Sequence, residues 1–390
     1  MTGFLSVAAV LPQLFDALSL TESQAGWLTG SAFASYALTV PLFTALTDRF
    51  DARSVVFVSL CLTALSGIGF ALFAEAYWSA IALRLIAGVG FAGVHFPGLK
   101  MLVDRLPGYL ITRGSGIYVS MFSLGGAGSF LVAGLVVAFL PWPWVFIISG
   151  LCSVLSAILI WVAIAPKKPH AASSAGITNV RRVISNVEAM RYGIAYFGHI
   201  WEMFSFRQWF VVFLGLNIGL ASNSEYAGWN LPLLAALTSL AAWPASLAVM
   251  EISQHFSRKK VVTLTVLTSL CVAIALSMMA LASTPLLLGV MIFYSMTCFG
   301  DSSAMAGGVI GAVDARVRGM ALAMYALLGF CGGALGPAVV GMVLEAAGGR
   351  HEPVAWVLAW LTIGAGTLVV AGAINCPWRS KLSELKGERK

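Results

Sequence analysis

The sequence predicts an all-α membrane protein with twelve transmembrane helices in two pseudo-symmetric bundles of six. Three observations support this fold class: the long apolar runs, the scarcity of charge and the placement of the basic residues. Hydrophobic residues make up 59% of the 390 residues and charged residues 10%, and the mean hydropathy is +0.90. A soluble domain carries about 25% charged residues. We therefore expect most of the chain to lie in a bilayer.

The apolar runs define the expected spans, because a membrane-crossing helix needs about 20 predominantly apolar residues. The first span is barely long enough and already contains Gln13 and Asp16. We expect either that the chain begins about ten residues late relative to its relatives or that this short helix begins inside the membrane. The expected spans are 1–18, 25–46, 54–74, 78–99, 114–139, 144–165, 190–216, 227–250, 261–282, 285–312, 319–346 and 352–375.

One long polar break separates the sixth span from the seventh. We expect residues 166–189 to form a cytoplasmic linker between an N-terminal bundle over 1–165 and a C-terminal bundle over 190–375. Residues 376–390 form the expected cytoplasmic tail.

The basic side chains gather in alternate gaps between the spans. Of the 23 Lys and Arg, all but Arg84, Arg207 and Arg350 lie in six such regions or at their edges. By the positive-inside rule these regions are cytoplasmic. Both termini are then cytoplasmic, in a cell inner (plasma) membrane. The net charge of +7 does not indicate nucleic-acid binding, because the cations are dispersed in small groups and form no continuous basic patch.

The two halves repeat each other weakly. The loop Thr47–Arg53 after the second span corresponds to Ser253–Lys260 after the eighth. Thr112–Gly114 before the fifth span corresponds to Val317–Gly319 before the eleventh. Corresponding loops in a six-plus-six chain predict two bundles related by an axis along the membrane normal.

The loop Asp48-Arg49-Phe50-x-x-Arg53 and the segment Arg84–Gly93 resemble two motifs of the major facilitator superfamily, and the span count and the linker resemble that family over essentially the whole chain. The resemblance implies a secondary-active transporter and not an enzyme. It implies that Asp48 holds the cytoplasmic gate shut by capping a helix in the other half, and that Arg84 lies at the substrate cavity. The further gating candidates are Arg49, Arg53, Arg113 and Arg318.

The sequence departs from the family pattern at several positions. Thr44 and Asp51 stand where the loop motif has glycine, and Gln254 stands where the second-half copy has Asp. The fifth span, with Gly125–Gly128, lacks the Gly-Pro of the family's antiporters. A run of small residues from Gly332 to Gly341 in the eleventh span is typical of close helix packing.

Ionisable residues inside a span are the candidates for function, because each costs about 2.5–3.5 kcal/mol at the helix centre. The seventh span holds the densest group. At 100° per residue, His199, Glu202, Met203 and Arg207 share an arc of about 140°. We expect this arc to face the cavity between the bundles, where Glu202 and His199 exchange protons and Arg207 either binds an anionic part of the substrate or tunes Glu202. His199 is also a substrate-binding candidate. The alternative is an internal ion-pair network that holds this span to its neighbours.

Other polar and aromatic residues complete the candidate site. Asp301 is the second proton-site candidate, with a helix-packing contact as the alternative. His95 is expected at a cytoplasmic-side gate or in packing, and Lys100 is expected to snorkel to the interface. The aromatic residues expected in substrate binding are Trp201, Tyr118 and Tyr325, with packing or anchoring at the interface as the alternative for each.

The mixture of cations and acids favours a small organic anion or zwitterion moved with protons, by symport or antiport. The alternatives are multidrug efflux by proton antiport, a non-transporting membrane sensor, and a copper or other soft-metal importer that uses the pairs His199-x-x-x-Met203 and Met320-x-x-x-Met324. The sequence has no Walker-type ATP motif. We expect no cofactor and no resident metal, and the expected partners of a monomeric protein are a small-molecule substrate, protons and the lipid bilayer.

Overall fold

A computed structural model describes residues 3–167, 177–314 and 317–376. Within these ranges the chain is helical and contains no strand. The helices are α1 (Ser6–Ala9), α2 (Leu11–Leu18), α3 (Glu22–Leu46), α4 (Ala52–Phe73), α5 (Tyr77–Val103), α6 (Ile111–Val137), α7 (Pro143–Ala163), α8 (Ile177–Ile184), α9 (Val187–Gly219), α10 (Leu231–His255), α11 (Arg258–Ser277), α12 (Thr284–Gly300), α13 (Ser302–Ala312), α14 (Arg318–Ala346) and α15 (Pro353–Asn375), with 3-10 turns at Gly108–Leu110 and Ala221–Tyr226.

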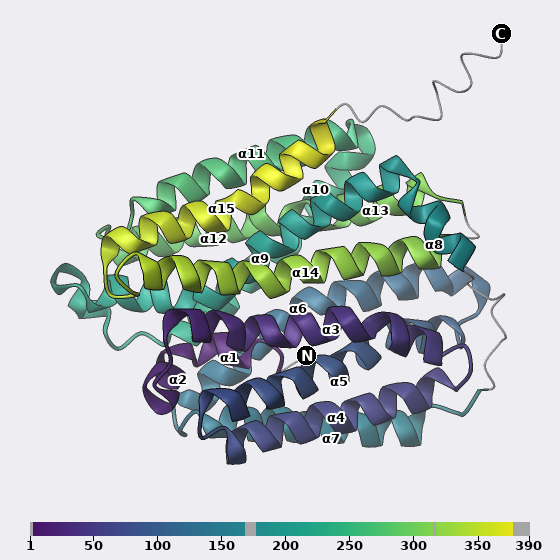
Figure 1. The fold of residues 1–390 in the computed structure, drawn as a ribbon, viewed down its shortest axis with the longest axis horizontal. Helices are drawn as coiled ribbons and strands as arrows, with labels where there is room; N and C mark the ends of the chain where they lie inside the picture. Colours follow the sequence, from purple (N-terminus) through teal and green to yellow (C-terminus); the bar gives the residue numbers. More distant parts are fainter. Residues whose placement is uncertain (1–2, 168–176, 315–316, 377–390) are drawn as a thin grey trace, which may run out of the picture.

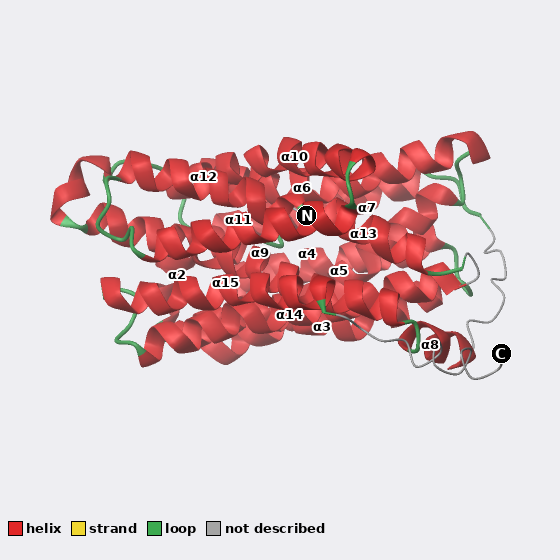
Figure 2. Ribbon diagram, turned by 90° about the horizontal axis from the view of Figure 1, so that it is seen from above, coloured by secondary structure: helices red, strands yellow, loops and turns green. Residues whose placement is uncertain are grey.

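The long helices run side by side along one direction (Figures 1 and 2). Helices α1–α7 form an N-terminal half and α9–α15 a C-terminal half, and α3 lies against α14 at their boundary (Figure 1). Counting α12 with α13, eight of the described helices are long and apolar enough to cross a membrane by length and composition alone. The predicted all-α membrane fold is confirmed. The expected linker and tail lie partly outside the described residues.

Two expected spans are interrupted. The first consists of α1 and α2, because Pro12 has no N–H to donate to the carbonyl of Ala8 and its ring crowds that carbonyl. The expected span 285–312 is divided at Asp301, where α12 ends and α13 begins. A candidate ionisable residue therefore lies at a helix break, where backbone groups are less fully occupied than in a continuous helix.

The two halves touch most closely where α3 crosses α14. A Cβ added to Gly26 of α3 would lie 2.4 Å from the carbonyl oxygen of Pro337, and one added to Gly341 of α14 would lie 2.2 Å from the carbonyl oxygen of Glu22. Side chains at these positions would push the two backbones apart. Small residues thus allow the halves to seal against each other, which agrees with the packing role expected for the glycine run in α14.

The loops divide between two ends of the molecule. The end that carries most basic residues, called the basic end below, is formed by helix α8 and by the described turns at 47–51, 104–110, 164–167, 185–186, 256–257 and 313–314. The opposite end is formed by the turns at 19–21, 74–76, 138–142, 220–230, 278–283 and 347–352.

Candidate functional site

Glu202 of α9 lies inside the C-terminal half. Its Oε1 accepts hydrogen bonds from Ser269 Oγ of α11 at 2.5 Å and from Tyr294 Oη of α12 at 2.7 Å. The side chain is 2% exposed. The expectation that Glu202 faces a cavity between the bundles is therefore wrong, because hydroxyl groups from two neighbouring helices of its own half shelter its charge.

His199 joins α9 to the helix break at Asp301. His199 Nδ1 lies 2.9 Å from Asp301 Oδ1, and Nε2 lies 2.5 Å from Ser302 Oγ. The His199 and Asp301 side chains are 1% and 3% exposed. Asp301 Oδ1 is close enough for an ion pair but is not aligned as a hydrogen-bond acceptor. The three proton candidates of the sequence therefore occupy the interior of one half, as the internal-network alternative described.

Arg207 extends from the same helix to the seam between the halves. Its guanidinium carbon lies 4.3 Å from the ring centroid of Phe299 and 5.9 Å from that of Phe204. A Cβ on Gly126, in α6 of the other half, would lie 3.1 Å from both Nη1 and Nη2. The guanidinium thus packs between an aromatic ring of α12 and the backbone of α6.

The guanidinium of Arg207 has unused donors. The residue is 3% exposed, and its Nε and Nη2 are buried without a hydrogen-bond acceptor. No ion pair to it occurs within the ranges that the structure describes. Burying a cation without a hydrogen-bond acceptor is unfavourable, because nothing compensates for its lost hydration. This position therefore favours the binding of an anionic ligand.

Aromatic residues from both halves meet beside Arg207. Phe33 of α3 lies 4.0 Å from Phe204 of α9 and 5.9 Å from Phe330 of α14, between ring centroids. Tyr36 lies 4.3 Å from Phe330, and its buried hydroxyl has no hydrogen-bond partner. These four residues, called the aromatic layer below, lie at the boundary between the halves.

Arg84 lies elsewhere, within the N-terminal half. Its Nε and Nη2 donate to the carbonyl oxygens of Leu28 and Phe4, each at 3.2 Å. It borders a cavity of about 30 Å³ that Ser66 and Ser153 also line, which is room for about one or two water molecules. The resemblance implied that Arg84 lies at the substrate cavity. In the structure its hydrogen bonds are to α3 and to the N-terminal segment of its own half, and no contact to Arg207 is seen in the described residues.

The remaining substrate candidates are also separated. Trp201 donates its indole N–H to the carbonyl oxygen of Thr362 in α15 at 2.9 Å, on a different face of α9 from Arg207. Tyr118 donates to carbonyl oxygens of α5. Tyr325 stacks on Tyr196 with ring centroids 3.9 Å apart. Each side chain mainly ties one helix to its neighbour.

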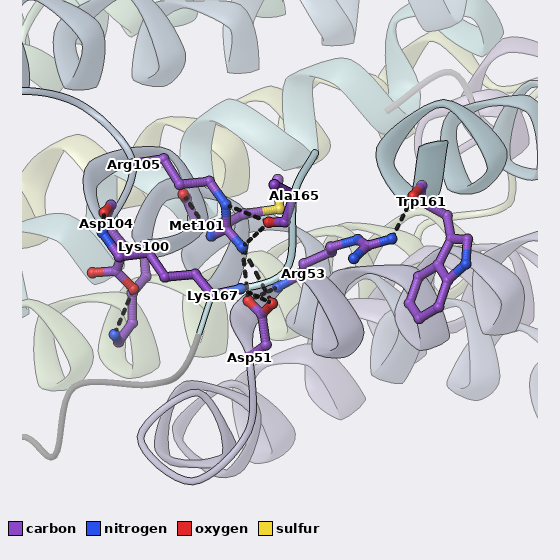
Figure 3. A network of polar contacts seen from close by, with 9 residues as sticks. All are labelled: Asp51, Arg53, Lys100, Met101, Asp104, Arg105, Trp161, Ala165 and Lys167. Atoms are coloured by element: carbon purple, nitrogen blue, oxygen red, sulfur yellow. Dashed lines mark hydrogen bonds and ion pairs between the residues drawn. The ribbon is translucent and has the colours of Figure 1, made fainter. Parts of the chain in front are cut away.

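At the basic end, Asp51 is the centre of a polar network (Figure 3). It caps α4 by accepting from the Arg53 N–H at 3.0 Å, and it accepts from the Lys167 N–H at 2.8 Å and Arg105 Nη2 at 2.9 Å. Partial burial alone would raise the pKa of Asp51, but these donors outweigh burial and lower it overall. The sequence showed Asp51 only as a departure from the loop motif, although an Asp just before an apolar run is typical of a helix cap.

The expected gating residues do not form one assembly. The carboxylate of Asp48 makes no hydrogen bond or ion pair within residues 3–167, 177–314 and 317–376. Arg49 and Arg113 are exposed. Arg53 lies 4.1 Å above the ring of Trp161 and donates to its carbonyl oxygen. The side chain of Arg318 lies outside the described part of the structure.

The opposite end carries a connection between the halves that the sequence did not reveal. Glu22 Oε1 accepts from the backbone N–H and from Nη1 of Arg350, both at 3.1 Å. The Ser23 N–H donates to Glu345 Oε2 at 2.9 Å. The guanidinium of Arg350 also lies 3.9 Å from the ring centroid of Phe15. Glu22, Ser23, Glu345 and Arg350 are called the latch below.

Other hydrogen bonds between the halves also lie toward the opposite end. The side-chain oxygen of Gln208 accepts from the Thr29 hydroxyl, and its amide nitrogen donates to the carbonyl oxygen of Ala25. Asn230 donates to the carbonyl oxygen of Gly134. In the described part of the chain, the cross-half hydrogen bonds therefore close the opposite end.

This architecture agrees with the family to which the sequence is similar. Residues 1–300 match the family model of the Major Facilitator Superfamily. The chain belongs to the Major Facilitator Superfamily. The predicted multi-pass membrane architecture agrees with this membership, and the relatives and structural neighbours named below are transporters.

The curated relatives are distant and match in part. The chain is 25% identical over 154 residues to a niacin transporter of Acinetobacter baylyi, which covers 40% of this chain and 35% of that protein. It is 24% identical over 249 residues to a hexuronate transporter of Bacillus subtilis, which covers 61% and 58%. The chain thus spans between about a third and somewhat over half of the length of these two relatives.

Solved structures share the fold across nearly the whole chain. A bacterial homologue of the human lysosomal transporter Spinster, in an inward-facing and unoccupied conformation, has a TM-score of 0.73 at 16% identity and covers 96% of this chain and 92% of that one. A D-xylose-proton symporter has a TM-score of 0.76 at 14% identity and covers 97% and 95%. These likenesses show the transporter fold.

Proposed function

We propose that this protein is a proton-coupled secondary transporter of a small organic anion, and that it works by alternating access in a cell inner membrane with the basic end in the cytoplasm. The single observation that carries the proposal is the buried guanidinium of Arg207, which has unused donors at the seam of the two halves. A carboxylate can take two parallel hydrogen bonds from a guanidinium. A substrate carboxylate would therefore supply the acceptors that the protein does not.

The position of Arg207 suits alternating access. The guanidinium belongs to α9 of the C-terminal half but packs against Gly126 of the N-terminal half. An anion held there touches both halves, so its binding energy depends on how the halves are arranged. Differential binding of this kind is what allows a ligand to shift a conformational equilibrium.

The buried acids of the C-terminal half supply the proton site in this proposal. Glu202 lies five residues before Arg207 on α9, and the pair His199–Asp301 adjoins the same helix. An anion at Arg207 offsets the positive charge of the guanidinium. The loss of this positive charge favours protonation of the acids in the same half, so the anion and a proton bind together.

The relatives support this substrate class. Two of them are named for the transport of organic acids, niacin and hexuronate, and one solved neighbour is a D-xylose-proton symporter. The soft-metal alternative receives less support, because both ring nitrogens of His199 already lie within bonding distance of Asp301 and Ser302.

The latch defines the conformation of this structure in the proposed cycle. Its bonds join α3 and the end of α14 at the face opposite the basic end. With the basic end in the cytoplasm, the closed face is the outer one and the transporter is inward-facing.

A thermal-shift screen followed by transport in proteoliposomes tests the proposal. Purified protein is screened against organic anions, lipophilic cations and Cu(I), and stabilisation by an organic anion is expected. Arg207→Gln should abolish transport of that anion while the protein still inserts, and Arg182→Gln, which changes an exposed arginine of the basic end, should leave it unchanged. Stabilisation only by a lipophilic cation or Cu(I), or full transport by Arg207→Gln, would contradict the proposal.

A further inference from the structure

We infer that the preferred substrate of the Arg207 site is a monocarboxylate with a flat aromatic body, the carboxylate on the guanidinium and the ring against the aromatic layer. The inference rests on the proposed function and names the substrate class of the same site. It depends on three features of the surroundings of Arg207 in the described part of the structure: a single cation with unused donors, neighbouring aromatic rings and few free polar groups.

The charge balance indicates a single carboxylate. Of the buried arginines inside the bundles, Arg84 lies in the N-terminal half and already donates to two carbonyl oxygens. Arg207 has the unused donors. Glu202 and Asp301 lie in the same half as Arg207 and would repel a second negative charge. A dicarboxylate would therefore leave one of its charges without a partner.

The walls indicate a flat apolar body. Phe299 covers one face of the guanidinium at 4.3 Å, and Phe204 connects Arg207 to the rest of the aromatic layer. Phe33 and Phe330 come from different halves, so their contact changes when the halves rock. A substrate ring can make the same stacked or edge-on contacts with this layer that its rings make with one another.

The supply of hydrogen-bonding groups argues against a polyhydroxylated substrate. In the described part of the structure, the buried groups without a partner near the aromatic layer are the hydroxyls of Tyr36, Ser205 and Tyr325. A sugar acid carries several hydroxyls, and most of them would be buried against rings without a partner. Unpaired buried polar groups weaken binding strongly. A ring with few polar atoms avoids this desolvation penalty.

Competition for binding to the purified protein tests the inference with four probes. Benzoate has the charge and the ring, cyclohexanecarboxylate has the charge without the flat ring, glucuronate has the charge with hydroxyls, and benzamide has the ring without the charge. We expect benzoate to bind roughly three- to tenfold more tightly than cyclohexanecarboxylate. Glucuronate should bind more weakly still, and benzamide should not compete.

Two variants on α12 link the preference to the wall. Phe299→Leu keeps an apolar side chain but removes the ring, so the ratio of benzoate to cyclohexanecarboxylate affinity should fall to about one while both acids still bind. Phe293→Leu is the matched control, because Phe293 lies on the same helix and is 49% exposed. Its ratio should equal that of the wild type.

The outcomes separate this inference from the proposed function. Equal affinity for benzoate and cyclohexanecarboxylate, or tighter binding of glucuronate, would overturn the aromatic assignment and leave anion transport in place. Failure of every carboxylate to bind, with no effect of Arg207→Gln on transport, would overturn the proposed function and this inference with it.

Discussion

Replacing Arg350 by Gln should open the end opposite the basic end, which is the outer face in the proposed orientation. The change removes the Nη1 bond to Glu22 and the cation above Phe15, while the backbone bond from residue 350 to Glu22 can remain. The Arg350 and Glu22 side chains are 23% and 12% exposed, so the pair lies between a surface ion pair, worth about 0.2–1 kcal/mol, and a shielded charged hydrogen bond, worth about 1.5–3 kcal/mol.

We therefore expect a loss of about 1–2 kcal/mol from the inward-facing state. This corresponds to a shift of about 5–30-fold toward the outward-open state. The magnitude follows from the latch bond alone, because the glycine contacts between α3 and α14 are unchanged by the substitution.

Distances between two spin labels, measured by double electron–electron resonance, report this shift. Spin labels at Glu75→Cys and His351→Cys, both exposed at the opposite end in different halves, should show a longer distance component that grows in Arg350→Gln. Arg182→Gln, at the basic end, serves as the control. An unchanged distance distribution in Arg350→Gln would refute the reasoning that the latch holds the halves together.

Further predictions concern the buried acids and the basic end. Glu202→Gln should remove the pH dependence of transport in proteoliposomes but retain solute exchange, because the amide oxygen can still accept hydrogen bonds from Ser269 and Tyr294. A retained pH profile would show that Glu202 is not the proton site and would point to Asp301. Asp51→Asn should destabilise the protein by roughly 1 kcal/mol near neutral pH. A carboxyl whose pKa is lowered on folding stabilises the fold above its ordinary value of 3.8 and loses this contribution as the pH falls through the lowered value. The difference in melting temperature between the wild type and Asp51→Asn should thus be constant above about pH 5 and become smaller below pH 3.8. A difference that grows in acid would show that the contacts of Figure 3 do not stabilise the ionised carboxylate.

Much of the fold could be predicted from the sequence because a bilayer imposes helix length directly. Backbone groups in hydrocarbon must bond within their own segment, so apolar runs of about 20 residues report the helices themselves. The two helix breaks were harder to predict. Pro12 breaks the first span through a purely local effect, whereas the break at Asp301 coincides with the ion pair to His199, which comes from another helix.

The candidate site was predicted in its residues and not in its surroundings. The cost of charge in a membrane identified Glu202 and Arg207, but helix periodicity placed them on one arc and could not say which neighbour each meets. Glu202 meets hydroxyls of α11 and α12, while Arg207 reaches α6. The latch was invisible for a related reason, because Glu22 and Arg350 are 328 residues apart and each resembles an ordinary loop charge.

The central claim is that the carboxylate of the substrate binds Arg207 at the seam of the two halves. An experimental structure with 4-bromobenzoate, in which anomalous scattering locates the bromine, tests this claim most directly. We expect a bromine peak beside the aromatic layer, with the carboxylate on the guanidinium of Arg207. A peak beside Arg84 in the N-terminal half, or no ordered ligand at Arg207 at saturating concentration, would contradict it.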